Sequence, residues 1–539
     1  MLYINMLMLL ASTVLAGTVI LITIIAYELY NFSLTYRKFG QPRSLIQAQE
    51  KSAYDILERA TRAYYGLLKL YTETIRPIRN RLSQPMKCLP HNVSSILDIE
   101  TRVGSTLSTC GSMYYVFDGY QRIIMIGSYK TAKAFYKTPA YSTITRVYPY
   151  LGYVFNNLLQ HCIGTHTGKE WLTMKKPLTQ FFTTRSVRLH YDSIIDEVRL
   201  WMDDLAKQTH TGGLALHALS LDKLTISILS NIVYGKLDQT DLSELYDLSV
   251  MHNKLMISMG CRMAIRIDRF CKFGLDECKL VDEFWSRWSA FNNKQIDRIE
   301  KSTASDKTLI DAMLSTDTYV DRRTMYQTLY EIMLFNSDIM VDSFANLIWN
   351  IASNPVIQSK LYAECNNVEV EAYTQIDELL YLPLVLNESA RLNPGIVQTF
   401  AETINEPMDL NGYTFESGTM FSLDTQMINR DPDIWADPNT FDPSRFTDQA
   451  SQTGQSGQPN QDRLFAFHRF GLSPRKCMGN VFADYILKIG VVMLLNKYAI
   501  FVDTDSANRS ANPSNTERQT IPNLSNCIML NRIKFDARV

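Results

Sequence analysis

The sequence predicts a mainly α fold with small β-sheets, preceded by one N-terminal transmembrane helix. From about residue 127 to 390 the hydrophobic residues recur at helical spacing, while β-type alternation is confined to two short stretches. An uncharged apolar run also lies at residues 6–27. The hydrophobic fraction of 46% in 539 residues is ample for a large core, and the net charge of -1 gives no reason to expect a nucleic-acid partner.

The apolar run at residues 6–27 is predicted to be a membrane anchor. At about 1.5 Å per residue, a helix of this length spans the ~30 Å hydrocarbon core of a bilayer. No basic residue precedes the run, whereas Arg37, Lys38 and Arg43 follow it. The positive-inside rule then places the remaining chain in the cytosol. A buried globular helix is the alternative interpretation of this run.

Turn residues and composition locate the β elements of the body. Residues 113–127 are rich in Tyr, Val, Phe and Ile around an Asp-Gly turn, which predicts a β-hairpin. A second β-rich stretch is predicted from 397 to 423, with Asn411 and Gly412 as its turn. Residues 449–462 are almost all polar, which predicts a solvated insertion. The 9 cysteines include no CxxC pair, which favours a reducing compartment with most thiols as small core residues.

Cys477 lies in a loop, residues 470–479, that leads directly into a long apolar run predicted to be a helix. A thiol at a helix N-terminus, beside Arg475 and Lys476, is in a position that favours the charged thiolate. One thiolate without companion ligands does not suit zinc, which takes four protein donors or three and a water. It suits haem iron, for which a single axial cysteine pushes electron density onto the metal. A structural cysteine beside a chance basic pair is the alternative.

This loop resembles the cysteine loop of the haem-thiolate monooxygenases, the cytochrome P450 superfamily. Ser473 stands where a second glycine is usual, and the residues that fit the pattern in register are Phe470, Gly471, Arg475, Cys477 and Gly479. The resemblance implies haem b with Cys477 as the axial ligand of its iron. It implies that Phe470 shields the sulfur from water and that Gly471 permits the tight turn. It also implies that Gly479 lets the next helix approach the porphyrin and that Arg475 pairs with a haem propionate.

A charged pair on a later helix resembles a second motif of the family. Glu388 and Arg391 lie three residues apart on a predicted helix that stops at Pro394. Their surroundings resemble the family's K helix, and residues 429–446 resemble the stretch whose arginine joins that pair. Carried over, Glu388, Arg391 and Arg445 form a buried ionic triad that braces the cysteine loop, with a structural role.

Trp171 and Lys175 resemble the pair on the family's C helix that binds a propionate. Arginine is usual at the second position, and Lys175 keeps the charge but loses the bidentate fork. An ordinary amphipathic helix with a core tryptophan is the alternative. The family commonly supplies another propionate-binding base from the strand after the K helix, but that interval has no Lys, Arg or His. Gln398, a backbone donor or His468 are the candidates, although His468 is equally a loop histidine.

Residues 333–354 are predicted to form one long helix closed by Pro355, which resembles the family's I helix across the haem face opposite the cysteine. The family's acid lies seventeen residues before the closing proline, and 355 − 338 = 17 assigns Asp338 to that position. Ile339 and Met340 then replace the two threonines of the family pattern. The acid is kept and the alcohol is lost.

The loss of the threonines bears on proton delivery. O–O cleavage consumes protons, and a threonine hydroxyl normally holds the relay water. Met340 cannot donate a hydrogen bond of any strength. Ser337, Asn336, a substrate hydroxyl, or Asp338 acting through water alone are the candidates for this task. The catalytic residues predicted from this helix are therefore Asp338, Ser337 and Met340. We expect either substrate-assisted O–O cleavage or an outcome other than plain hydroxylation, such as desaturation, ring expansion or coupling.

The resemblance covers nearly everything after the anchor. It implies a cytochrome P450 fold for residues 111–539 as a haem-binding catalytic domain, after a membrane anchor at 1–30. Residues 31–110 are expected to form a membrane-proximal linker and surface helices. The chain carries no flavin or dinucleotide motif, so electrons from NADPH are expected through the flavins of NADPH-cytochrome P450 reductase, docking near Lys476 and Arg475. Resemblance to microsomal members implies a single-pass endoplasmic reticulum protein with a cytosolic catalytic domain.

The amino-acid sequence of the cysteine loop most resembles that of fungal enzymes that tailor secondary metabolites. The expected function is therefore a monooxygenase that uses O2 to oxidise a small organic molecule. The alternatives are a haem-thiolate isomerase or dehydratase that needs no external electrons, and a catalytically idle haem-binding protein. Substrate contacts are expected from the I helix and from residues 140–165, 250–275 and 395–402, which carry no readable code.

Overall fold

The computed structural model describes residues 111–118, 121–146, 152–209, 218–261, 276–302, 307–319, 321–447, 461–472, 475–502 and 533–538. The predicted anchor at 1–30, the segment 31–110 and most of the polar insertion lie outside these residues. Among the described helices, none has the length and apolar character needed to cross a membrane.

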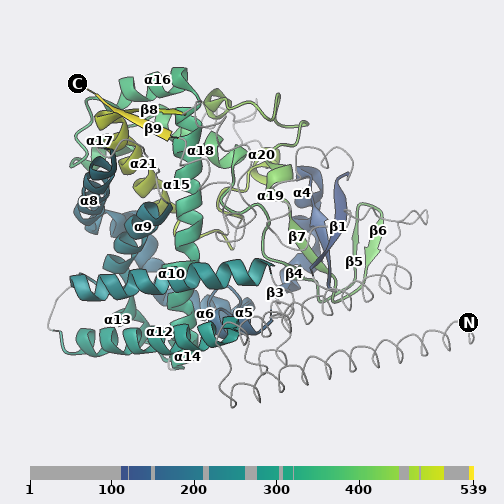
Figure 1. The fold of residues 1–539 in the computed structure, drawn as a ribbon. Helices are drawn as coiled ribbons and strands as arrows, with labels where there is room; N and C mark the ends of the chain where they lie inside the picture. The colour runs from purple at the N-terminus through teal and green to yellow at the C-terminus, as the bar shows by residue number, and fades with distance from the viewer. Residues whose placement is uncertain are drawn as a thin grey trace, which may run out of the picture.

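The described body is mainly helical, as predicted. Its α-helices are α4 (Tyr129–Lys137), α5 (Gly152–Leu158), α6 (Gly168–Leu178), α7 (Thr184–Leu189), α8 (Tyr191–Thr209), α9 (Ala218–Val233), α10 (Gln239–Cys261), α12 (Asp276–Glu300), α13 (Leu309–Leu314), α14 (Arg322–Tyr330), α15 (Asn336–Ala352), α16 (Pro355–Cys365), α17 (Tyr373–Asp377), α18 (Tyr381–Leu392), α19 (Thr425–Ile428), α20 (Gln461–Ala466) and α21 (Asn480–Lys497). Figure 1 shows α15 running through the middle of the molecule, with α8 and α9 on one side and the larger sheet on the other.

The described strands form three small sheets. They are β1 (Met113–Asp118), β2 (Gln121–Ile126), β3 (Thr145–Arg146), β4 (Glu402–Thr403), β5 (Met408–Leu410), β6 (Tyr413–Phe415), β7 (Met420–Leu423), β8 (Tyr498–Val502) and β9 (Ile533–Ala537). The largest sheet has the order β1-β2-β7-β4-β3, and β5-β6 and β8-β9 form antiparallel pairs. Strands β2 and β7 pair in parallel, with Ile123 opposite Met420, whereas the other neighbours in this sheet are antiparallel.

Both predicted β regions are confirmed. Strands β1 and β2 form the expected hairpin, with Met113 opposite Ile126. In the second region β5 and β6 are joined through Asn411 and Gly412, whose φ angles are 50° and 80°. Positive φ at both central residues is what a type I′ hairpin turn requires, so the Asn-Gly pair supplies the backbone that this turn needs.

The predicted I helix is longer than the sequence indicated. Helices α14 and α15 are joined without a break by a π-helical turn, Glu331–Phe335, so that the rod runs from residue 322 to 352. The prediction that it begins near 333 is therefore wrong, because a π turn breaks the hydrophobic period that marks an α-helix. Its C-terminal limit is confirmed, since α15 ends at Ala352 and Pro355 begins α16.

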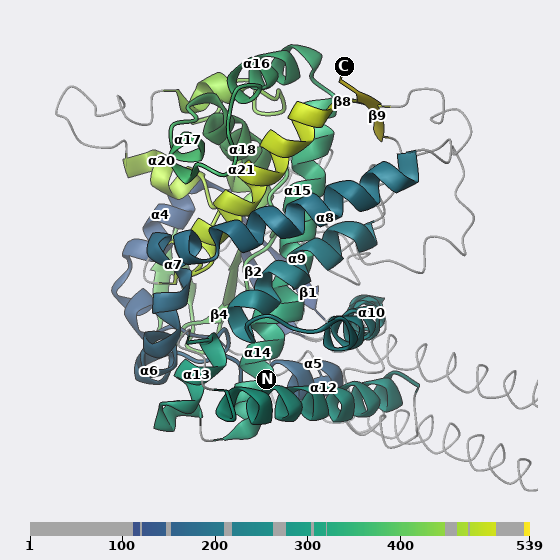
Figure 2. The same cartoon turned by 90° about the vertical axis from the view of Figure 1, so that its left-hand side faces the viewer.

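Helix α15 is held in the core by close helix–helix packing. A Cβ atom on Gly490 of α21 would lie 2.4 Å from Cζ of Phe344, so only glycine fits there without displacing the ring. Figure 2 shows α21 crossing α15 at this side of the molecule. The helix that follows the cysteine loop is thereby packed directly against the predicted I helix. In α12, Cys278 is disulfide-bonded, so it departs from the reduced state expected for most of the thiols, whereas Cys162, Cys365 and Cys477 are free.

Candidate active site

The cysteine loop has the compact form that the sequence predicted. The N–H of Cys477 donates to the carbonyl of Phe470 at 2.9 Å, which closes the loop. Gly471 has φ +73°, in the left-handed region that glycine adopts without strain. Helix α21 begins at Asn480, directly after Gly479. A Cβ atom on Gly479 would lie 3.8 Å from Sγ of Cys477, so glycine at this position keeps space open beside the sulfur.

Cys477 is accessible and yet enclosed. It is exposed, whereas the free cysteines Cys162 and Cys365 are buried. Burial of its surroundings nevertheless raises the pKa of the thiol, against the opposing effects of the backbone N–H groups that follow it and of Lys476. Cys477 is therefore an exposed residue whose thiol is nevertheless surrounded by protein atoms.

The sequence-based expectation for the thiolate needs correction. Arg475 was expected to favour the charged sulfur, but its guanidinium donates instead to the carbonyls of Gly164 and His166, at 3.1 and 2.8 Å. The pKa of the Cys477 thiol is raised, not lowered, because burial and the charge of Glu331 outweigh Lys476 and the backbone N–H groups that follow the cysteine. A metal ion at the sulfur reverses this balance, because a coordinating thiol is deprotonated by the charge of the metal.

The residues predicted to bind propionates converge on one place. The guanidinium of Arg475 lies 4.4 Å from the ring centroid of Trp171, and the ammonium of Lys175 lies 4.7 Å from the same centroid. Trp171 and Lys175 come from α6, and Arg475 comes from the cysteine loop. Trp171 also packs, partly buried, against the main hydrophobic core, so both interpretations of this tryptophan, cation-binding ring and core side chain, agree with its surroundings.

The predicted ionic triad forms, with one difference in geometry. Glu388 and Arg391 make a bidentate pair at 2.7 and 2.8 Å, and both side chains have 0% exposure. Arg445 lies 3.3 Å from Glu388 as an ion pair, but without the alignment of a hydrogen bond, and it donates to the carbonyls of Ala436 and Asp437. The backbone N–H of Asp442 also donates a hydrogen bond to Glu388.

The triad is tied to the segment before the cysteine loop. Arg391 donates to the carbonyl of Asn429 at 2.9 Å, and the side-chain oxygen of Asn429 accepts from the N–H of His468 at 3.2 Å. Arg463, in α20, donates to the carbonyl of Arg445 at 2.9 Å. These bonds join α18, the turn around residue 445 and the approach to the loop, as a bracing role requires.

His468 does not fill the electrostatic gap left by the missing base. Its Nε2 lies 2.8 Å from the carbonyl of Phe465, and its ring stacks on Tyr136. Burial lowers the pKa of His468 to about 4, so the ring is uncharged at neutral pH. It is a structural loop histidine, and it carries no positive charge with which to pair a propionate. Gln398, the other candidate, forms a β-bridge with Asp424.

A cation that the sequence did not indicate, Arg146, lies near Arg475 instead, since both donate to the carbonyl of Gly164. Arg146, on β3, ion-pairs with Glu402 of β4 at 3.4 Å and donates to the carbonyl of Gly164 at 3.2 Å. That carbonyl also accepts from Arg475. The strand after the K helix thus carries an acid that holds an arginine from its neighbour. No motif marks Arg146 in the sequence, because the β3–β4 pairing joins segments more than 250 residues apart.

The three residues predicted to be catalytic point in different directions. Nε2 of His252 lies 3.0 Å from Oδ2 of Asp338, whose side chain is 30% exposed. Ser337 is buried and donates to Asp222 at 3.0 Å. Met340 packs, half-buried, against the main hydrophobic core. Asp338 is therefore the polar member of the three that remains accessible.

The middle of α15 has a partly accessible segment, residues 338–343. Each of residues 338–343 is partly accessible, whereas 344–348 are all buried, although the helix passes through the centre of the molecule in both views (Figures 1 and 2). The loop after α18 borders this face, since a Cβ atom on Gly395 would lie 3.0 Å from Cγ2 of Ile339. An exposed cysteine, a cluster of cations around Trp171 and a partly accessible segment of α15 together fit a haem, which needs a ligand for its iron and counter-charges for its propionates.

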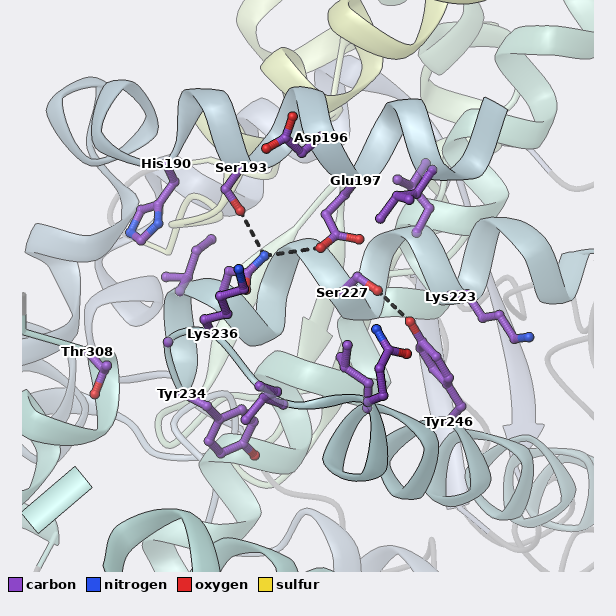
Figure 3. A pocket seen from close by; sticks show the side chains of 18 of the residues that line it. His190, Ser193, Asp196, Glu197, Lys223, Ser227, Tyr234, Lys236, Tyr246 and Thr308 are labelled. Carbon is purple, nitrogen blue, oxygen red and sulfur yellow. Dashed lines mark hydrogen bonds between the residues drawn. The ribbon is translucent and has the colours of Figure 1, made fainter. Parts of the chain in front are cut away.

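A separate cavity of about 1310 Å³ lies between α8, α9 and the start of α10 (Figure 3). Its lining mixes acids and bases, among them Glu197, Lys223 and Lys236. Figure 3 shows Ser227 and Tyr246 hydrogen-bonded at one wall, at 2.6 Å. No residue that the sequence predicted for the site lines this cavity, and we assign it no role.

Comparisons with known proteins agree with this geometry. The family model described as Cytochrome P450 matches residues 102–524. The chain is 24% identical to Cytochrome P450 monooxygenase asaD of Aspergillus flavus, over 82% of this chain and 86% of that protein. It is also 24% identical to Cytochrome P450 monooxygenase PUL2 of Kluyveromyces lactis, over 81% and 88%. The solved structure of retinoic acid bound cyanobacterial CYP120A1 has a TM-score of 0.65 at 16% identity, covering 81% of this chain and 94% of that one.

Proposed function

The chain belongs to the cytochrome P450 family, and on this premise we propose that it oxidises a small molecule of fungal secondary metabolism with electrons from NADPH-cytochrome P450 reductase. As a member it is a P450 monooxygenase with a haem-thiolate iron cofactor, a separate redox partner and a small-molecule substrate. The relatives named above from Aspergillus and Kluyveromyces support a fungal pathway. The single observation that carries the proposal is the exposed Cys477, held in a closed loop directly before α21.

Different residues of the site would bind different parts of the haem. Cys477 would hold the haem iron, and the cations of Arg475 and Lys175 beside Trp171 would bind the propionates. We assign the place of the missing strand base to Arg146, because it shares the Gly164 carbonyl with Arg475. The haem, when bound, supplies the iron at which O2 is activated.

Asp338 is the proposed proton carrier on the oxygen side. Monooxygenation consumes one O2, two electrons and two protons, and yields the oxidised substrate and one water. Asp338 takes a proton from a water molecule beside the accessible segment 338–343 and passes it on from a carboxyl oxygen, so that the carboxyl group returns to its initial protonation state. Ser337 is engaged by buried Asp222 and cannot share this task without breaking that bond.

Replacing Met340 with threonine tests whether the lost alcohol shapes the reaction. A hydroxyl at this position can hold a relay water. We therefore expect the amount of product formed per NADPH consumed to rise, or the product to shift toward plain hydroxylation. The change should be smaller than the roughly 100-fold that a fully positioned proton donor contributes. Met340→Leu is the control, because it keeps an apolar side chain. Unchanged product and coupling in Met340→Thr would show that the departure from the family pattern is incidental.

The membrane location is also a proposal. It rests on the uncharged run at residues 6–27 and on the basic residues that follow it. We propose a single-pass protein of the endoplasmic reticulum with a cytosolic catalytic domain. Full-length protein should stay with the membranes after extraction at alkaline pH, whereas protein lacking residues 1–30 should be partly released. Equal release of the two would contradict the anchor.

We propose that the substrate has an aromatic or flat apolar part. Phe335 and Phe400 stack with their centroids 6.0 Å apart, and both are half-buried. Phe335 ends the π turn, and Phe400 lies in the segment 395–402 that was expected to touch substrate. Arg146 lies 5.9 Å from the Phe400 centroid, so a cation borders the same wall.

The decisive experiment is turnover with a purified reductase. Full-length protein is reconstituted with NADPH-cytochrome P450 reductase and fed the metabolite that accumulates when its gene is deleted. Product should appear only with NADPH, reductase and O2 together. Product without electrons would show an isomerase or dehydratase instead. Binding that changes the iron spin state but gives no product would show an idle haem protein.

A further inference from the structure

A buried chain of polar groups ends at the accessible acid of α15. His252, on α10, places Nε2 at 3.0 Å from Oδ2 of Asp338 and Nδ1 at 2.7 Å from the hydroxyl of Tyr330. Exposure falls along this chain, from 30% for the Asp338 side chain to 1% for that of His252 and 0% for Tyr330. The three groups come from α15, α10 and α14, so the tertiary fold alone brings them together.

The direction of these hydrogen bonds depends on the tautomer of His252, and a carboxylate at Asp338, which can only accept, selects the one with the hydrogen on Nε2. Burial raises the pKa of Tyr330, so its hydroxyl keeps its proton and can donate it to Nδ1 of His252. A neutral imidazole that accepts at Nδ1 carries its hydrogen on Nε2, which then donates to Asp338. A protonated imidazole donates at Nε2 as well. In both states His252 presents an N–H to the carboxyl group of Asp338.

A second branch removes the competing hydroxyl. Ser337 donates to Oδ1 of Asp222 at 3.0 Å, and Ser249 donates to Oδ2 at 2.6 Å. Burial raises the pKa of Asp222, and the charge of Asp338 acts in the same direction, whereas the two serines and His252 oppose it. Ser337 is therefore committed to a buried acid, and the accessible proton carrier of this network is Asp338.

The other charges near α10 do not compete for His252. Arg287, on the neighbouring α12, lies 3.8 Å from Asp247 and contacts the sulfur of Met251. The titratable groups that face the imidazole in the described structure are thus Tyr330 from α14, Asp338 from α15 and Asp222 from α9.

We propose that His252 is the positioning residue for proton delivery, the group that orients Asp338 on a helix that lacks the family's threonine hydroxyls. The imidazole binds Oδ2 of Asp338 on the buried side. The other carboxyl oxygen, Oδ1, is then left for a water molecule on the accessible side of the helix. Asp338 then takes up and releases protons with its orientation fixed. The inference rests on the proton role proposed above for Asp338, and it adds the residue through which that role is arranged.

The activity test compares His252→Leu with His252→Gln in the full-length protein with its reductase. Leucine removes the donor to Asp338, so product per NADPH should fall roughly 10-fold or more, as when an outer partner of a reactive group is lost. Glutamine can still donate a hydrogen bond and should restore most of the coupling. His190→Leu, a half-buried histidine at the end of α7, is the control and should couple as the parent does.

A second measurement does not depend on turnover. In protein labelled at the histidine ring carbons, the His252 resonance is identified by its loss in His252→Gln, and we expect Asp338→Asn to shift it. An unmoved resonance would overturn the pairing. Normal coupling in His252→Leu, or equal loss in the leucine and glutamine variants, would overturn the positioning role while leaving Asp338 as proton carrier. Normal coupling in Asp338→Asn would overturn both.

Discussion

Replacing Cys477 with serine is expected to abolish the thiolate spectrum of the enzyme. The hydroxyl of serine stays protonated where the thiol would lose its proton to the metal, so the iron loses its anionic sulfur ligand. The reduced, carbon-monoxide-bound parent should show the strongly red-shifted Soret band that a sulfur ligand produces, and Cys477→Ser should lack it. Product formation should fall by at least the ~100-fold expected for loss of an essential group.

The matched control for this substitution is Cys365→Ser. Cys365 is also a free cysteine, but it is buried in α16, where burial raises its thiol pKa to about 12. This variant should keep the red-shifted band. A parent-like spectrum in Cys477→Ser would contradict sulfur ligation at 477, and with it the assignment of the active site.

Glu388→Gln is expected to cause the largest loss of stability among single changes at the site. The substitution removes the only carboxylate of the triad and leaves the guanidinium of Arg391 buried at 0% exposure without a counter-charge. Breaking a buried ion pair from one side costs roughly 3–5 kcal/mol. We expect an earlier chemical unfolding midpoint and a lower haem content, because the triad is bonded to the approach of the cysteine loop through Asn429.

Glu378→Gln is the control for the triad. Glu378 is an exposed residue just before α18, so its charge should contribute little to stability. The two variants differ from the parent by the same atoms. If both unfold at the parent's midpoint, the triad is not a stabilising element. If Glu388→Gln unfolds early but keeps its full haem content, the bracing of the cysteine loop is excluded.

Local patterns were sufficient for much of the fold. The Asn411-Gly412 turn, the β1–β2 hairpin and the helix after Cys477 each depend on neighbouring residues, and each is confirmed. The Glu388–Arg391 pair could also be predicted, because three-residue spacing on a helix places both side chains on one face.

The sequence could not show which distant residues a given side chain contacts in the folded protein. Arg475 lies two residues before Cys477 in the chain, yet its guanidinium turns to Trp171 and to the carbonyl of Gly164. Arg146 and His252 carry no motif, because each meets its partner across segments 256 and 86 residues apart. Periodicity reports which face of a helix is apolar, but it does not report which distant residue that face will meet.

The pairing of β2 with β7 has a consequence for how the protein is made. Ile123 and Met420 are adjacent in the sheet but 297 residues apart in the chain, since 420 − 123 = 297. At translation rates of about 5–20 residues per second, the N-terminal hairpin leaves the ribosome roughly 15 to 60 s before its parallel partner is synthesised. During that interval the edge of β2 presents unpaired backbone groups, a template for pairing with other chains. Nascent molecules are therefore most in need of a chaperone before the last quarter of the polypeptide has emerged.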